Sequence, residues 1–461
     1  MTDERELLEL TASLAADYLE SLSKRPVFPP IEPDELRAAL GGPLQDEPLD
    51  GARVITELVS GADGGIVASG SGRYFGFVIG GTLPTALAAD WLASTWDQNA
   101  GLYICSPAAS VVEEIVRDWL LDLFGLPAGA SIGFVTGTQM AHVTGLAAAR
   151  LHVLERVGWD VGRDGLCGAP RITVIVGARR HVTIDRALRL LGLGTPISVE
   201  SDAEGRIVVD ALAAALAETS GPTIVCAQVG EVNTGAADPI SEIADLCEGT
   251  DRWLHVDGAF GLWAAASPQL RGLTAGLARA DSWTTDAHKW LNVPYDSGIV
   301  ICAHPDAHRR AMTMQAAYLV QTEDVERVRD EVDWTPEFSR RARAFPIYAA
   351  LRGLGRSGVA QLVERSCRMA RIAAAGLSAI PNVEVLNDVV LNQVLFRFDE
   401  DPITDAVLAD AQFGGDVWLS GTKVDGRSAI RLSVSNWRTD ERDIERVIQA
   451  FSGVTAGLDP I

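Results

Sequence analysis

Between about residues 60 and 350 the chain alternates short apolar runs with longer segments of helical pattern, and this alternation most constrains its fold. The apolar runs read as strands at 132–137, 171–178, 222–229, 252–259, 281–287 and 297–303. Helical patterns lie at 108–124, 139–157, 183–192, 208–217 and 240–248. Because a strand that is apolar along its whole length must be covered on both faces, the pattern predicts an α/β fold with a parallel-rich sheet between helices.

The N-terminal residues predict an arm and not a targeting signal. Residues 4–22 are acidic and have the pattern of an amphipathic helix, which is typical of neither a signal peptide nor a transit peptide. The proline-rich segment 25–36 follows and predicts an extended arm that wraps over another surface, such as a second subunit.

The C-terminal part predicts a second, smaller α/β unit. A helical pattern over 358–379 leads into apolar runs at 389–398 and 428–437, and a last helix is expected near 438–452. The expected division is an N-terminal helical segment over 1–60, a large domain over 61–350 and a small domain over 351–461.

Charge and composition exclude several classes of function. The net charge of −23 argues against nucleic acid or an anionic membrane as a partner, because both need a basic surface. No run approaches the roughly 18 apolar residues that a membrane span requires. The six cysteines show no CxxC spacing and the histidines form no HExxH motif, so we expect a cytoplasmic protein without a metal site.

Four polar features follow the ends of the predicted strands, where open α/β sheets place their ligands. The first is the turn Gly137-Thr138-Gln139, between a strand and a helix. A glycine turn that opens a helix offers free N–H groups and the positive end of the helix dipole to an anion such as phosphate. An ordinary strand–helix turn would have the same pattern. The second feature is His181, which is either a helix cap or a flat ring that stacks on a flat ligand.

The third feature is Asp257, which ends an apolar strand and is followed by Gly258 and Ala259. A carboxylate buried there needs a cationic partner, because an unpaired charge would cost several kcal/mol. A structural salt bridge would satisfy it, but its small neighbours favour a broad ligand. The fourth feature is His288-Lys289, where a desolvated lysine could act as an amine nucleophile towards a carbonyl.

Together the four features ask for one ligand. It would be planar, anionic at one end, basic at a ring nitrogen, and it would carry an aldehyde. Pyridoxal 5′-phosphate has all four properties, and it is bound through a lysine Schiff base with a carboxylate on its pyridinium nitrogen.

The chain resembles the group II pyridoxal-phosphate-dependent decarboxylases of fold type I, which include the aromatic L-amino acid and glutamate decarboxylases. The resemblance runs from residues 72–127 to 428–451, and "DAHKWLNVP" with "HVDGAFG" upstream carries it. It implies a seven-stranded, mostly parallel sheet in the large domain, a homodimer with the active site at its interface, and decarboxylation of an L-amino acid to an amine and carbon dioxide.

The resemblance also implies roles for individual residues. Lys289 would form the Schiff base, Asp257 would hold the pyridinium nitrogen, and His181 and Ala259 would cover the two faces of the ring. Gly137, Thr138, Gln139 and His288 would surround the phosphate, and Thr234 would lie near the phenolic oxygen. Arg431 would bind the substrate carboxylate. Tyr74 and Phe75 would line the substrate pocket, which slightly favours an aromatic substrate.

Two departures from the family pattern leave the chemistry open. Family members carry a loop tyrosine that protonates the intermediate, but no tyrosine lies between Leu319 and Asp333; Tyr318 precedes this stretch. Tyr318 or His181 could supply the proton instead. Oxidative deamination to an aldehyde, carbon–carbon cleavage, transamination and a non-catalytic regulatory dimer are the alternatives. The second departure is "TGTQMAH", in which His142 falls on the helix after the phosphate turn and is assigned no role beyond packing.

Overall fold

The structure is a computed structural model that describes residues 2–314 and 328–455. Its centre is a seven-stranded sheet in the order β1-β7-β6-β5-β4-β2-β3, in which β7 runs antiparallel to both of its neighbours and all other pairs are parallel. The strands are β1 (Ser131–Val135), β2 (Thr173–Gly177), β3 (Ile197–Val199), β4 (Thr223–Gln228), β5 (Trp253–Asp257), β6 (Ser282–Asp286) and β7 (Gly298–Cys302). The expected mostly parallel sheet is confirmed.

Helices cover this sheet on both faces, which accounts for strands that are apolar along their whole length. α6 (Thr138–Glu155) packs on β5, β6 and β7, and most of its side chains are buried. The other helices around the sheet are α5 (Pro107–Phe124), α7 (Val161–Asp164), α8 (Val182–Leu190), α9 (Val209–Ala217), α10 (Ile240–Cys247) and α11 (Pro305–Met312). Short 3-10 turns lie at Asp63–Gly65, Gly261–Ala266, Arg271–Thr274, Leu277–Arg279 and Glu331–Asp333.

A second, antiparallel sheet has the order β10-β11-β9-β8. Its strands are β8 (Val383–Val385), β9 (Gln393–Phe398), β10 (Ser420–Val424) and β11 (Arg427–Ser433). Helices α12 (Ala344–Ser378), α13 (Asp401–Phe413) and α14 (Glu441–Thr455) accompany it. The boundary expected at residues 350/351 falls inside α12, which begins well before the expected residue 358 and bends at Gly355, where φ is 63°.

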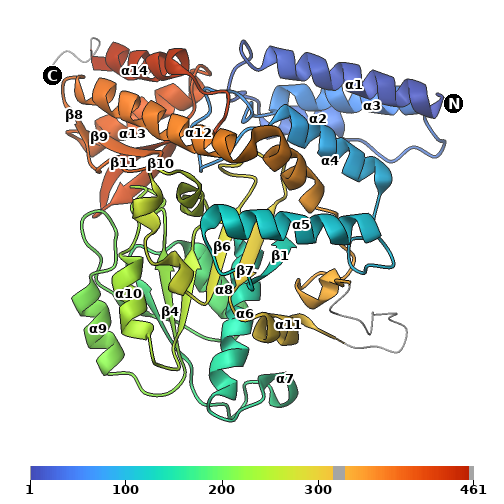
Figure 1. Ribbon diagram of the computed structural model, residues 1–461. Helices are drawn as coiled ribbons and strands as arrows, with labels where there is room; N and C mark the ends of the chain where they lie inside the picture. Colours follow the sequence, from blue (N-terminus) through green and yellow to red (C-terminus); the bar gives the residue numbers. More distant parts are fainter. Residues whose placement is uncertain (1, 315–327, 456–461) are drawn as a thin grey trace.

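The N-terminal segment forms three helices whose side chains remain outside the core of the chain. α1 (Glu4–Ser21), α2 (Pro33–Leu40) and α3 (Gly51–Ala62) contain no fully buried residue. Figure 1 shows them at the upper right beside α4 (Pro84–Trp96), with the smaller sheet at the upper left, α12 between them and the large sheet below. Within residues 2–314 and 328–455, no helix is both long enough and apolar enough to cross a membrane.

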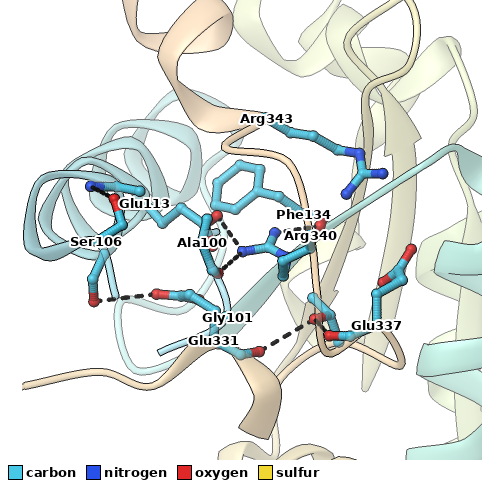
Figure 2. A network of polar contacts seen from close by, with 12 residues as sticks. Ala100, Gly101, Ser106, Glu113, Phe134, Glu331, Glu337, Arg340 and Arg343 are labelled. Atoms are coloured by element: carbon cyan, nitrogen blue, oxygen red, sulfur yellow. Dashed lines mark hydrogen bonds and ion pairs between the residues drawn. The ribbon is translucent and has the colours of Figure 1, made fainter. Parts of the chain in front are cut away.

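A buried charge cluster ties residues 328–343 to the edge of the large sheet (Figure 2). The guanidinium of Arg340 lies 2.6 Å from Glu113 on α5 and donates to the carbonyls of Ala100 and Phe134. Nearby, Arg329 pairs with Glu331 at 2.7 Å. Because all four charged side chains are buried, the cluster holds the chain after residue 327 against α5 and β1.

Candidate active site

A cavity of about 400 Å³ opens beyond the carboxyl ends of β4, β5 and β6. Most residues singled out in the sequence meet there, although they come from both sheets. Its lining consists of Phe77, Val78, Gly137, Thr138, Gln139, His181, Thr183, Gln228, Gly230, Val232, Asp257, Ala259, Phe260, Asp286, His288, Lys289 and Arg431.

Lys289 is positioned by Asp286, an acid to which the sequence analysis assigned no role. Its Nζ lies 3.1 Å from Asp286 Oδ2, while the backbone N–H of Thr138 donates to Oδ1 at 2.7 Å. Burial alone would raise the pKa of Asp286, but the charges of Lys289 and His288 outweigh burial and hold that pKa below its usual range. The ionised carboxylate therefore ties the lysine to the turn that begins α6.

The ring of His288 is fixed from two sides. The backbone N–H of Ser297 lies 3.0 Å from its Nδ1, and its Nε2 lies 3.5 Å from Asp286 Oδ2. Tyr295 stacks on the ring with centroids 4.3 Å apart. The imidazole thus presents a defined face and edge to the cavity.

The turn at Gly137 comes close to the start of β7. A side chain at Gly298 would overlap the backbone of Gly137, so this approach requires glycine. The approach brings the first residues of α6 to the cavity. The side-chain oxygens Thr138 Oγ1 and Gln139 Oε1 are buried there and have no hydrogen-bond partner among the described residues. A buried polar atom is costly when unpaired, so these two oxygens favour a polar ligand.

Arg431 is the cation that the smaller sheet contributes to the cavity. It belongs to β11 and is only 8% exposed, and its Nε has no hydrogen-bond partner within residues 2–314 and 328–455. Burial lowers the pKa of this guanidinium, with Glu231 opposing the shift. A buried cation at a cavity wall is suited to an anionic group such as a carboxylate.

Asp257 is the last residue of β5, and neighbouring groups stabilise its ionised carboxylate. The backbone N–H of Ala259 donates to Oδ1 at 3.0 Å, and Oδ2 lies 3.3 Å from Nε2 of His142. Burial alone would raise the pKa of Asp257, but His142 and His181 outweigh burial and keep that pKa below its usual range. The sequence assigned His142 no role, but the structure places its ring beside Asp257. His142 lies four residues after Thr138 on α6, and this spacing, which puts both side chains on one helix face, was the signal available.

Three predicted site residues are not in the cavity lining. The hydroxyl of Thr234 donates to the carbonyl of Glu204 at 2.6 Å. Phe75 is fully buried in the core of the smaller sheet, and Tyr74 stacks on Trp418 with centroids 5.1 Å apart. Instead, Phe77 and Val78 line the cavity. Tyr318 lies outside the described residues.

This arrangement suits pyridoxal 5′-phosphate. An amine, Lys289, and an ionised carboxylate, Asp257, line one cavity, as a lysine Schiff base and a pyridinium nitrogen require. The hydroxyl of Thr138, which has no partner among the described residues, can donate a hydrogen bond to the phosphate at the start of α6. The residues present therefore fit the cofactor.

Comparison with known proteins agrees with this chemistry. Residues 33–399 match the family described as "Pyridoxal-dependent decarboxylase conserved domain". The chain is 29% identical to the aromatic-L-amino-acid decarboxylase of Bacillus atrophaeus, over 98% of this chain and 95% of that one. It is 31% identical to the L-2,4-diaminobutyrate decarboxylase of Rhizobium meliloti (strain 1021), over 81% of this chain and 76% of the relative.

A solved structure extends the likeness to the fold. The crystal structure of Oryza sativa TDC with PLP and tryptamine superposes with a TM-score of 0.91 at 24% identity, covering 98% of this chain and 97% of that one. The expected fold type I architecture is confirmed. The chain therefore belongs to the pyridoxal-dependent decarboxylase family, as a carboxy-lyase that uses pyridoxal 5′-phosphate to decarboxylate an amino acid.

Proposed function

We propose that the chain decarboxylates an L-amino acid, holding its cofactor as a Schiff base on Lys289 and releasing carbon dioxide and an amine. One observation carries this proposal: Lys289, the ionised Asp257 and Arg431, whose Nε has no partner among the described residues, line the same cavity. A non-catalytic regulatory dimer is set aside, because the chain belongs to a family of enzymes and keeps these three groups together.

Each residue of the cavity has a separate proposed role in the reaction. When bound, pyridoxal phosphate supplies an electron sink for the bond that breaks at the substrate's Cα. Asp257 holds a proton on the ring nitrogen, while His181 and Ala259 cover the two ring faces. Arg431 binds the substrate carboxylate and orients it before it is lost.

The remaining proposed cofactor contacts surround the phosphate and the phenolic oxygen. Gly137, Thr138, Gln139 and His288 hold the phosphate, which is supported by the position of the turn and by the Thr138 hydroxyl, a donor without a partner among the described residues. Thr234 keeps its proposed place near the phenolic oxygen only if its bond to the carbonyl of Glu204 opens.

The substrate side of the cavity is apolar. Phe77, Val78 and Phe260 line it, and Phe77 and Val78 adopt positive φ angles of 53° and 59° that turn this segment towards the cavity. We infer that the substrate carries an apolar or aromatic side chain, as the aromatic-L-amino-acid decarboxylase of Bacillus atrophaeus would accept. The diaminobutyrate decarboxylase relative makes a basic side chain the second candidate.

The product decides between decarboxylation and the aldehyde-forming alternative. We expect the protein loaded with pyridoxal phosphate to convert one of a pool of L-amino acids into amine and carbon dioxide, detected by mass spectrometry. Because no tyrosine lies between Leu319 and Asp333, protonation at Cα depends on another donor, such as His181 or Tyr318. Aldehyde with ammonia and peroxide would show oxidative deamination, and a keto acid would show transamination. A shortened amino acid would show carbon–carbon cleavage.

We further propose that the protein is a homodimer joined through its N-terminal helices. Apolar side chains are exposed on α3 and α4: Leu58 is 55% exposed, Trp91 42% and Leu92 48%. A cavity with mostly apolar walls also lies between α1 and α3. Exposed apolar side chains gathered in this way are typical of a subunit interface.

This interface makes a prediction for the mass in solution. We expect sedimentation to show a dimer for the native chain and a monomer for the double substitution Leu58→Asp and Leu92→Asp, because charges would be buried at the interface. Leu190→Asp is the matched control, since Leu190 is a 64% exposed leucine on α8. A native monomer, or equal dissociation of the control, would contradict the proposal.

A further inference from the structure

On the side of Asp257 that faces away from the cavity lies a row of hydrogen-bonded, buried side chains. His142 Nδ1 lies 2.9 Å from His255 Nε2, and His255 Nδ1 lies 2.7 Å from Ser282 Oγ. The indole N–H of Trp253 donates to the same Ser282 oxygen at 2.8 Å. These four side chains come from α6, β5 and β6, and each is at most 1% exposed.

Trp253, at the far end of this row, limits the possible directions of its hydrogen bonds. An indole N–H can only donate, so Ser282 Oγ accepts from Trp253 and its own proton is free for Nδ1 of His255. Burial, with His142, lowers the pKa of His255 to about 3, so this ring is neutral and has one proton. That proton then lies on Nε2 and is donated to His142 Nδ1. The proton of a neutral His142 consequently lies on Nε2, which faces Asp257.

The opposite direction of the hydrogen bonds also places a proton on His142 Nε2. If His255 donated to Ser282, His142 would have to donate from Nδ1, and a neutral His142 would turn a lone pair towards a carboxylate oxygen 3.3 Å away. Only a second proton, on Nε2, relieves that repulsion. Either way, Nε2 of His142 carries a proton directed at Asp257. Nε2 has no hydrogen bond of regular geometry among the described residues, so the contact with Asp257 is an electrostatic one.

Close packing holds the His255 ring in its position in this row of side chains. The ring of His255 lies against α6 at Gly145, where a Cβ would come within 3.2 Å of Cε1. His255 therefore has little room to turn and break its bond to His142.

We propose that His142 is a positioning residue whose Nε2 proton, fixed by His255, Ser282 and Trp253, keeps Asp257 charged and directed at the cofactor's ring nitrogen. This inference rests on the proposed contact between Asp257 and that nitrogen. His142 does not touch the cofactor, and its effect passes through Asp257 alone. Losing it should weaken cofactor binding and change the cofactor's absorbance.

Two amide substitutions at His142 separate positioning from packing. The amide nitrogen of glutamine in His142→Gln can take the place of Nε2, whereas His142→Asn is too short and places its amide near Nδ1. We expect His142→Asn to raise the dissociation constant for pyridoxal phosphate about tenfold, which corresponds to losing about 1.4 kcal/mol of electrostatic interaction with Asp257. Its absorbance without substrate should shift towards that of Asp257→Asn. His142→Gln should keep both properties close to native.

His308 provides a matched control. It is also a fully buried histidine bonded to a serine, with Nδ1 2.9 Å from Ser131 Oγ, but it lies on α11 and is not in the cavity lining. His308→Asn should leave the cofactor's affinity and absorbance unchanged even where it lowers the melting temperature.

The outcomes distinguish this inference from the function on which it rests. Native affinity and absorbance in His142→Asn, with both altered in Asp257→Asn, would overturn the role of His142 and leave the proposed function standing. Equal changes in His142→Asn, His142→Gln and His308→Asn would show packing only, which also overturns it. Unchanged properties in Asp257→Asn would remove the ring-nitrogen contact and this inference with it.

Discussion

Replacing Lys289 with alanine is expected to abolish the Schiff base and to lower turnover by at least about 10³-fold, the scale seen when an essential catalytic group is removed. The lysine lies beside Asp286 in the cavity, and no other lysine is in the lining of that cavity. Its amine is therefore the one available to react with the cofactor's aldehyde. Absorbance of the loaded protein and amine release from the substrate are the measurements.

The chain offers an unusually clean control for this experiment. It contains only three lysines, and Lys24 and Lys423 are exposed. Borohydride reduction followed by peptide mapping should place the cofactor on Lys289 in the native protein. Lys423→Ala should keep both the absorbance and the activity. Labelling of Lys24 or Lys423 in place of Lys289, or full activity in Lys289→Ala, would contradict the assignment.

The sequence predicted those parts of the fold whose burial leaves a local pattern. β4 and β5 were visible because all their residues are buried. β3 was missed because it has three residues and Ile197 is 45% exposed, so it has no continuous apolar run. The part of α12 before Gly355 was not predicted, and at Gly355 the backbone leaves the helical conformation, with φ 63° and ψ 176°, so α12 consists of two helical segments joined at a kink.

The site residues that stand in short sequence motifs could be predicted, whereas contacts that depend on how distant elements pack could not. Lys289 and Asp257 stand in short motifs, and the structure brings them to one cavity. The contact between His142 and Asp257 depends on how α6 lies on the sheet, which no short motif records. Phe75 shows a related failure: it lies close to Phe77 in the chain, but its ring enters the core of the smaller sheet. The direction of a side chain in an irregular segment cannot be read from composition.

The largest effect on stability is expected at the buried charge cluster of Figure 2, through Arg340→Met. This substitution would leave Glu113, which is fully buried, without its guanidinium partner at 2.6 Å. Removing one member of a buried ion pair costs about 3–5 kcal/mol. The carbonyls of Ala100 and Phe134 would lose their donor as well. Chemical denaturation of the cofactor-free protein would measure the loss.

A second substitution tests whether the cost comes from the stranded charge. Adding Glu113→Leu to Arg340→Met should recover much of the lost stability, because an apolar pair of similar volume removes the unpaired carboxylate. The exposed i,i+4 pair of Arg53 and Glu57 is the control, and Arg53→Met should change the stability little. A double variant no more stable than Arg340→Met would show that the backbone contacts of Arg340, and not its charge, hold this region.

The same cluster predicts how stability depends on pH. Burial, and then the neighbouring Glu113, raise the pKa of Glu331 well above its usual value, although Arg329 opposes the shift. The folded protein therefore binds this proton more tightly than the unfolded chain does. Its contribution to stability is present below the ordinary glutamate pKa and is lost as the pH rises through the raised value. Glu331→Gln should remove that part of the decline, since a neutral amide replaces the titrating carboxyl. An unchanged pH profile in this variant would mean that Arg329 keeps Glu331 ionised throughout, and the four side chains would then form two complete ion pairs.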